Sequence, residues 1–143
     1  MHSAVMADVH SSDIFIGVAA VADYRPVDSA DQKIKKNADE MTLTMVKNPD
    51  ILAEVANLNK PPFCVGFAAE TNDVVNYARG KLERKKLDLI AANHVGGNET
   101  GFGVPDNAIT LIGKNSVIEL PKQNKTSLAR NLLLEITKAY KNS

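Results

Sequence analysis

The chain has 143 residues, enough for one domain with a real hydrophobic core, and 17 basic residues balance 17 acidic ones. We therefore expect no general nucleic-acid or membrane surface, and any cationic site must be local. The single cysteine, Cys64, excludes an internal disulfide framework and a multi-cysteine zinc site. No apolar run approaches the roughly 20 residues that span a bilayer, and the amino terminus lacks a signal pattern, so we expect a cytoplasmic protein.

Apolar strands alternate with amphipathic segments along the chain. The residue pattern predicts helices over 2–10, from 48 onward, over 72–86 and from about 126, and strands over 14–20, 42–46, 63–67, 88–92, 109–112 and 116–120. The last two strands flank Gly113-Lys114-Asn115, which is typical of a hairpin. The predicted fold class is α/β, a Rossmann-like, largely parallel sheet with helices on both faces and a C-terminal β-hairpin, in a single domain over 1–143.

Each predicted helix has one apolar face. The predicted inward-facing residues are Ile51, Leu52, Val55 and Leu58, then Val74, Val75, Ala78 and Leu82, and finally Leu128, Leu132, Leu133 and Ile136. Asn48, Pro49 and Asp50 predict a helix start with Asn48 as the cap. Nucleotide-binding α/β domains usually open with a strand, a glycine-rich turn and a helix, and this chain lacks that unit.

The composition of residues 22–40, with Pro26 and several lysines, predicts a long, mobile lysine flap. This flap follows an apolar strand that ends near Asp23. Asp23 is a candidate ligand for a phosphate-bound metal ion or a sugar hydroxyl, or it is simply a turn residue. Lys33, Lys35 and Lys36 could close over a polyphosphate, although a solvated charge run is the commoner explanation of such a pattern.

Three strand exits predict a ligand crevice, because open α/β sheets bind ligands at the carboxyl ends of their strands. The exits end near Asp23, Glu70 and His94, and each has a small-residue pair: Ala19 and Ala20, Ala68 and Ala69, Ala91 and Ala92. These alanines would let a flat ligand approach the backbone, or they merely pack tightly beneath helices.

Other polar residues have open interpretations. Lys81 and Lys85 are four residues apart on one helix face and could neutralise phosphate together, or form an exposed basic face. The Pro49–Asp50 helix start suits backbone contacts to a base or sugar, and Phe67 could pack on a base or belong to the core. Cys64 is expected to be an inert strand residue, and the three histidines have no metal-site spacing.

Six segments in order resemble one enzyme family. They are residues 19–25 (AAVADYR), 33–36 (KIKK), 47–51 (KNPDI), 65–71 (VGFAAET), 89–93 (LIAAN) and 106–108 (DNA). Together they resemble phosphopantothenate–cysteine ligase, which in most bacteria is the carboxy-terminal half of a bifunctional coenzyme A biosynthesis protein. The resemblance runs from end to end of the chain, but the family's glycine-rich opening segments and the flavin-dependent decarboxylase half are not in it.

The resemblance implies a CTP-dependent ligation of 4'-phosphopantothenate and cysteine through an acyl-cytidylate, with Mg²⁺ on the triphosphate and with a homodimer as the working form. It implies that Lys33 is the catalytic cation and that Asp23 contacts nucleotide-bound Mg²⁺. The CTP-binding positions that it implies are Gly17, Ala19, Ala20, Asp23, Lys33, Pro49, Asp50, Ile51, Leu52, Phe67, Lys81 and Lys85. The alternatives are a non-catalytic nucleotide-binding or dimerisation fragment and an ATP-using relative.

Overall fold

The structure, a computed structural model, describes residues 1–35, 40–70, 73–94 and 105–143, and divides the chain into two compact units. The first unit combines residues 1–18 with 51–143, and the second holds residues 19–50. Each unit is described by itself below. Lys36, Thr71 and residues 95–104 lie outside the described residues.

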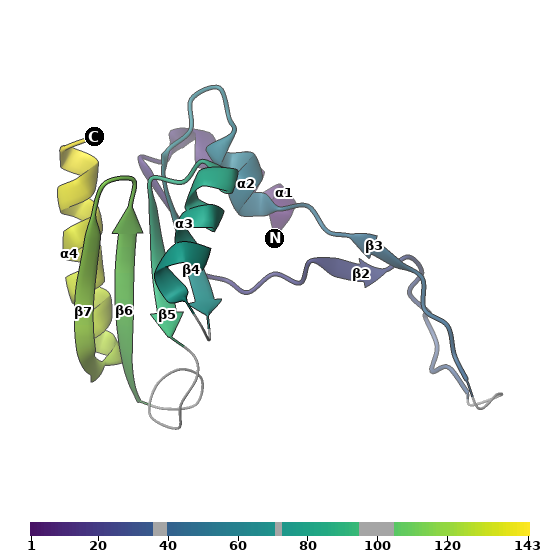
Figure 1. The fold of residues 1–143 in the computed structure, drawn as a ribbon. Helices are drawn as coiled ribbons and strands as arrows, with labels where there is room; N and C mark the ends of the chain where they lie inside the picture. Colours follow the sequence, from purple (N-terminus) through teal and green to yellow (C-terminus); the bar gives the residue numbers. More distant parts are fainter. Residues whose placement is uncertain (36–39, 71–72, 95–104) are drawn as a thin grey trace. The chain divides into compact units, whose positions relative to one another are not determined.

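The first unit is built on a five-stranded sheet in the order β1-β4-β5-β6-β7 (Figure 1). Strands β1 (Ile14–Gly17), β4 (Phe63–Glu70) and β5 (Leu89–His94) run parallel. Strands β6 (Asp106–Gly113) and β7 (Val117–Asn124) form an antiparallel hairpin beside β5. The prediction of an α/β sheet with a parallel centre and a C-terminal hairpin is confirmed.

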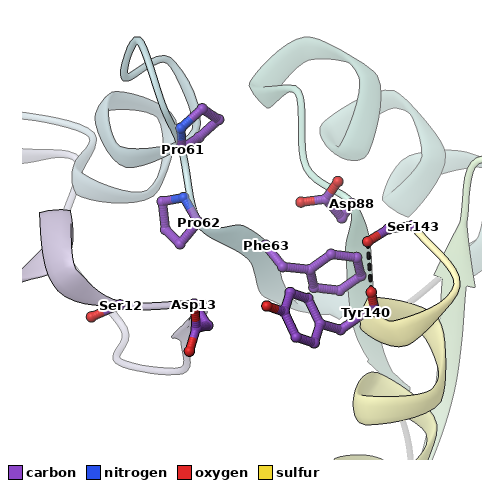
Figure 2. A pocket seen from close by; sticks show the side chains of 8 residues that line it. All are labelled: Ser12, Asp13, Pro61, Pro62, Phe63, Asp88, Tyr140 and Ser143. Carbon is purple, nitrogen blue, oxygen red and sulfur yellow. Dashed lines mark hydrogen bonds between the residues drawn. The ribbon is translucent and has the colours of Figure 1, made fainter.

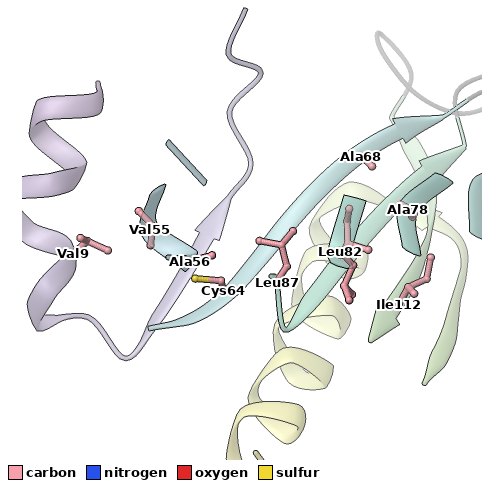
Figure 3. Packing of buried hydrophobic residues seen from close by; sticks show 11 residues of the cluster. Val9, Val55, Ala56, Cys64, Ala68, Ala78, Leu82, Leu87 and Ile112 are labelled. Atoms are coloured by element: carbon pink, nitrogen blue, oxygen red, sulfur yellow. The ribbon is translucent and has the colours of Figure 1, made fainter. Parts of the chain in front are cut away.

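Helices cover both faces of this sheet, as predicted. On one face lie α1 (His2–Asp8) with its following 3₁₀ turn (Val9–Ser11), α2 (Ile51–Ala56) and α3 (Val74–Lys85), whose buried residues share one core cluster (Figure 3). On the other face, α4 (Lys125–Lys141) packs onto a second cluster. Alternation along β5 separates the two, because Ile90 and Ala92 belong to the first cluster while Leu89 and Ala91 belong to the second.

Helix α4 shows how the apolar pattern determines the buried face. Leu128, Leu132 and Ile136 are buried, and the side chain of Asn124 caps the helix by accepting a hydrogen bond from the Ser127 backbone N–H. The prediction that Leu133 is also buried is wrong, since 51% of its surface is exposed. Consecutive helical residues are about 100° apart around the axis, so Leu133 cannot point the same way as Leu132.

The second unit is a two-stranded antiparallel ribbon of β2 (Tyr24–Pro26) and β3 (Met45–Lys47). The ribbon corrects two predictions: residues 22–40 contain a strand rather than loop alone, and the predicted strand over 42–46 begins only at Met45. Its pairing continues on either side, because Val27 N–H donates to the Thr44 carbonyl and Asn48 N–H donates to that of Asp23.

Candidate functional site

The parallel strands β1, β4 and β5 end at the same edge of the sheet, at Gly17, Glu70 and His94. This carboxyl edge is where open α/β sheets bind ligands. The predicted site residues fall on both units. Gly17, Ile51, Leu52, Phe67, Lys81 and Lys85 belong to the first, and Ala19, Ala20, Asp23, Lys33, Pro49 and Asp50 to the second.

Gly17 and Leu52, two of the predicted residues, lie against each other. Gly17 pairs in register with Gly66, and a Cβ atom on Gly17 would lie 3.2 Å from Leu52 Cδ1. A Cβ on Gly66 would lie 2.9 Å from Leu52 Cδ2 and 2.8 Å from Leu87 Cδ1. The paired glycines therefore open a space into which Leu52 of α2 packs, which brings the start of this helix close to the strands β1 and β4. Sequence reasoning missed the role of Gly66, which becomes visible only when the strand register is known.

The two lysines of α3 lie on the same side of the sheet as α2. Lys81 and Lys85 are both half-buried, one turn apart beside the buried residues Ala78 and Leu82. Helix α3 packs against α2 as well as against β4 and β5. The two lysines and the segment with Ile51 and Leu52 therefore belong to neighbouring helices on one face of the sheet.

Phe67 lies on the opposite face of the sheet. Its half-buried side chain packs against the cluster beneath α4, not against the cluster beneath α2 and α3. The structure therefore does not place Phe67 beside Leu52 or the α3 lysines, although all belong to the same unit. A contact of Phe67 with a base stays a prediction, and its contribution to the core is observed.

In the second unit, Asn48 holds the base of the ribbon together. Its Nδ2 donates to the Ala22 carbonyl at 2.7 Å, and its Oδ1 accepts from Arg25 Nη1 at 2.9 Å. The prediction that Asn48 caps the following helix is wrong. Helix α2 begins only at Ile51, and the side chain of Asn48 forms hydrogen bonds across the ribbon instead. These bonds fix the backbone on either side of Asp23, whereas Ala19, Ala20, Asp23, Lys33, Pro49 and Asp50 are all exposed.

Cys64 is buried in β4. Burial, and next the negative charge of Asp88, raise the pKa of its thiol to about 11, so the thiol stays protonated at neutral pH. The Asp88 carboxylate accepts a hydrogen bond from the Cys64 backbone N–H at 2.6 Å, and Asp88 N–H donates to the Cys64 carbonyl at 3.0 Å. The prediction of an inert strand cysteine agrees with this environment.

A pocket of about 370 Å³ lies at the opposite, amino-terminal edge of the parallel strands (Figure 2). Asp13 and Asp88 precede β1 and β5, and the rings of Phe63 and Tyr140 meet edge to face, with their centroids 5.8 Å apart. None of its residues was predicted as functional from the sequence. Its carboxylates suit a small cationic ligand, whereas the anionic nucleotide expected from the sequence requires cations.

The described residues contain neither a candidate metal-binding cluster nor a candidate membrane-spanning helix. Over residues 1–35, 40–70, 73–94 and 105–143, no three His, Cys, Asp or Glu side chains gather in a way that could hold a metal ion. Within those same ranges, none of the helices combines the length and apolar character that a bilayer-spanning segment needs.

The comparisons with known proteins agree in one family. The family described as "DNA/pantothenate metabolism flavoprotein C-terminal domain" matches residues 1–140. The chain is 55% identical over 139 residues to the coenzyme A biosynthesis bifunctional protein CoaBC of Vibrio vulnificus strain YJ016, covering 95% of this chain and 35% of that protein. It is 51% identical over 144 residues to CoaBC of Escherichia coli K12, covering 98% of this chain and 36% of that protein. The chain thus spans about a third of the length of these relatives.

One solved structure supports the same assignment, and a second has the same fold. The C-terminal domain of a coenzyme A biosynthesis bifunctional protein CoaBC matches with a TM-score of 0.77 and 30% identity, over 99% of this chain and 62% of that one. A DNA/pantothenate metabolism flavoprotein from Streptococcus pneumoniae matches with a TM-score of 0.73 at 22% identity, over 96% of this chain and 68% of that one. The second similarity concerns the fold alone.

Proposed function

Since the chain belongs to the family of DNA/pantothenate metabolism flavoprotein C-terminal domains, we propose that it serves the CTP-dependent ligation of 4'-phosphopantothenate and cysteine in coenzyme A biosynthesis. The observation that carries this proposal is the identity of 51–55% to CoaBC proteins over nearly the whole chain. The sequence motifs of the nucleotide site, which run from Gly17 to Lys85, are consistent with it.

The proposed reaction has two steps. First, the carboxylate of 4'-phosphopantothenate attacks the α-phosphate of CTP, so that an acyl-cytidylate forms and pyrophosphate leaves. Next, the amine of cysteine attacks the acyl carbon, CMP leaves and the amide forms with loss of a proton. Neither step needs a nucleophile from the protein, so the residues have to align the reactants and stabilise charge on phosphate oxygens.

Cationic side chains suit that task. We assign Lys33 to the negative charge that develops at the α-phosphate, and Lys81 and Lys85 to binding of the triphosphate. An ammonium group can donate up to three hydrogen bonds, so a lysine that contacts other protein groups can also bind a phosphate oxygen.

Mg²⁺ fits this set of residues as a companion of the nucleotide. Magnesium sites in nucleotide enzymes commonly use one or two carboxylates together with substrate phosphates, and exposed Asp23 is the carboxylate that we assign to this role. When bound, the ion supplies charge neutralisation at the triphosphate.

The first test is calorimetric titration of the 143-residue chain with CTP and Mg²⁺, with ATP as the comparison. Saturable binding that prefers CTP is expected. Absence of CTP binding by a chain that circular dichroism shows to be folded would contradict the proposal that these motifs form a nucleotide site by themselves.

A second test measures turnover and the role of Lys33. The matching segment of E. coli CoaBC is replaced with this chain, and pyrophosphate release that depends on 4'-phosphopantothenate is followed. We expect Lys33→Gln to lower the rate by about 10²-fold or more, as for other lost charge stabilisers. The matched control is Lys114→Gln, which removes a lysine from the β6–β7 turn at the amino-terminal edge and should leave the rate within about twofold. Wild-type rates in Lys33→Gln would contradict the assigned role.

The sequence leaves one alternative open. In that alternative the chain binds nucleotide or pairs with another copy without catalysing the ligation. CTP binding by the isolated chain, together with no pyrophosphate release in the exchanged protein, would favour it.

A further inference from the structure

The two peptide groups that flank Asp23 are both tied to a single residue, Asn48. The Ala22 carbonyl, which belongs to the peptide bond before Asp23, accepts a hydrogen bond from Asn48 Nδ2 at 2.7 Å. The carbonyl of Asp23 itself accepts one from the Asn48 backbone N–H at 2.8 Å. Because the orientations of the planar peptide groups on either side define the φ and ψ angles of a residue, these two bonds restrict the direction in which the Asp23 side chain leaves the backbone.

Arg25 determines which way the side-chain amide of Asn48 faces. Its guanidinium donates from Nη1 to Asn48 Oδ1 at 2.9 Å and to the Lys47 carbonyl at 3.2 Å. A guanidinium only donates hydrogen bonds and a carbonyl only accepts them, so the amide oxygen faces Arg25 and the amide nitrogen faces the Ala22 carbonyl. The side chain of Asn48 is therefore held in the orientation that binds the backbone before Asp23.

Strand pairing alone does not explain the bond between Asn48 and Ala22. The backbone pairing of β2 with β3 includes the bond of Asn48 N–H to the Asp23 carbonyl, and the side-chain bond extends it by one residue. Ala22 and Asp23 are exposed, so water can replace a protein partner there and the bond adds little to the stability of the fold. Its main effect is to fix the backbone of an exposed acidic residue, which a ligand that must meet the carboxylate in one geometry requires.

We propose that Asn48 is a positioning residue of the nucleotide site: with its amide oriented by Arg25, it holds Asp23 so that the carboxylate meets the Mg²⁺ ion of bound CTP. The inference rests on the proposed function, which assigns Asp23 to that ion. Magnesium demands near-ideal octahedral geometry, so an ion shared between a carboxylate and phosphate oxygens tolerates little displacement of the carboxylate. Residues that hold a metal ligand in place commonly matter for affinity almost as much as the ligand itself.

The test is Asn48→Ala, which removes the side-chain bonds and keeps the backbone N–H that binds the Asp23 carbonyl. The 143-residue chain and its variant are titrated with CTP at several Mg²⁺ concentrations. We expect CTP binding about 10–100-fold weaker in the variant, as for other lost partners of metal ligands, and a higher Mg²⁺ concentration for half-maximal binding. The circular dichroism spectrum of the ligand-free variant should match that of the wild type, because the lost bonds lie in an exposed segment.

A double variant shows whether Asn48 acts through Asp23. Asp23→Asn removes the carboxylate charge from the ion, so Asn48 then has no charged ligand left to position. Adding Asn48→Ala to Asp23→Asn should therefore weaken CTP binding by less than about twofold, far less than the same change does in the wild-type chain.

Asn57→Ala is the matched control. Asn57 follows α2, and its Nδ2 also donates to a backbone carbonyl, that of Ala53, at 2.7 Å. The variant thus loses a side-chain bond of the same kind and length outside the ribbon. We expect its affinity for CTP to stay within about twofold of wild type, since such an exposed bond adds little by itself.

The outcomes separate the two proposals. CTP binding by the wild-type chain combined with unchanged affinity in Asn48→Ala would overturn this inference and leave the proposed function standing. An equal loss of affinity with and without the Asp23 carboxylate would also overturn it, because Asn48 would then act by another route. So would an Asn48→Ala chain that no longer folds, since the side chain would then be required by the fold itself. A wild-type chain that binds no CTP in Mg²⁺ would contradict the proposed function, and the inference with it.

Discussion

Cys64, at the start of β4, and Asp88, just before β5, link these adjacent parallel strands through two hydrogen bonds. The Asp88 carboxylate binds the backbone N–H of Cys64, so its charge is held beside a buried thiol. Both burial and this charge favour the protonated thiol, in that order. The arrangement stabilises the first residues of β4 and β5 and removes the thiol from chemistry near neutral pH.

The raised pKa of Cys64 predicts a loss of stability in alkali. The thiol of the unfolded chain ionises near pH 9.0 and that of the folded chain only near about 11. Below pH 9 both states hold the proton; as the pH rises from 9 towards 11, the unfolded state alone loses it and becomes favoured. The wild-type chain should therefore lose unfolding free energy over this range relative to Cys64→Ala.

Urea denaturation at several pH values measures that difference. Because both chains carry the same lysines and tyrosines, the comparison isolates the thiol. A constant stability difference between pH 8 and pH 11 would show that Cys64 does not titrate as described. Native Cys64 should also resist alkylation at pH 8 and react once the chain is unfolded.

At the scale of elements, glycines in β1 and β4 leave the space in which Leu52 of helix α2 packs against the sheet. Gly66 has room for no side chain, since a Cβ would approach the terminal atoms of Leu52 and Leu87 to less than 3 Å. Gly80, in the middle of α3, is the opposite case, because a Cβ there would meet no atom of the described residues within 4 Å. One glycine is required by packing, and the other only weakens its helix.

Substituting alanine at these two positions should have opposite effects. Gly66→Ala forces Leu52 and Leu87 to move within a packed layer, so we expect it to destabilise the fold by about 1–3 kcal/mol. Gly80→Ala restricts the unfolded chain and suits a helix interior, so it should stabilise by about 0.5–1 kcal/mol. Urea unfolding midpoints provide the comparison, and equal stability of the two variants would contradict this account of the glycines.

Local residue patterns predicted the amphipathic helices and the faces that these helices bury. The apolar faces of α2, α3 and α4 follow the helical period, and Val55, Ala78, Leu82, Leu128, Leu132 and Ile136 are buried as expected. The β2–β3 ribbon was not foreseen, because β2 has three residues, includes Pro26, and pairs with residues about 20 positions later. No local pattern shows such a pairing.

Local motifs predicted some residues of the candidate site, but not how they are arranged on the sheet. Motifs indicated Gly17, Leu52 and the α3 lysines, and the structure places Gly17 and Leu52 in contact. That Phe67 faces the other side of the sheet depends on strand alternation within the assembled fold. The hydrogen bonds of the Asn48 side chain across the ribbon depend on the pairing of β2 with β3, which only the register reveals.

At the scale of the whole molecule, the ribbon of residues 19–50 exposes many apolar side chains. Among these are Val21, Tyr24, Val27, Ile34, Leu43 and Met45. A two-stranded ribbon is only marginally stable in water by itself, and exposed apolar clusters commonly mark protein interfaces. We propose that the ribbon is buried against a second copy of the chain, which agrees with the homodimer implied by the family resemblance.

This proposal makes a prediction about solution mass. Tyr24 and Met45 lie on the same face of the ribbon, because Tyr24 pairs with Lys47 and Pro26 with Met45, and side chains alternate along each strand. Sedimentation velocity should show a dimer for the wild-type chain, and Met45→Lys should shift it towards monomer by burying an unpaired charge. Tyr77→Lys, at an exposed position of α3, is the matched control and should leave the dimer intact. A wild-type monomer would contradict the assignment of the ribbon to a dimer interface. An unchanged dimer in Met45→Lys would instead place the interface away from this face of the ribbon.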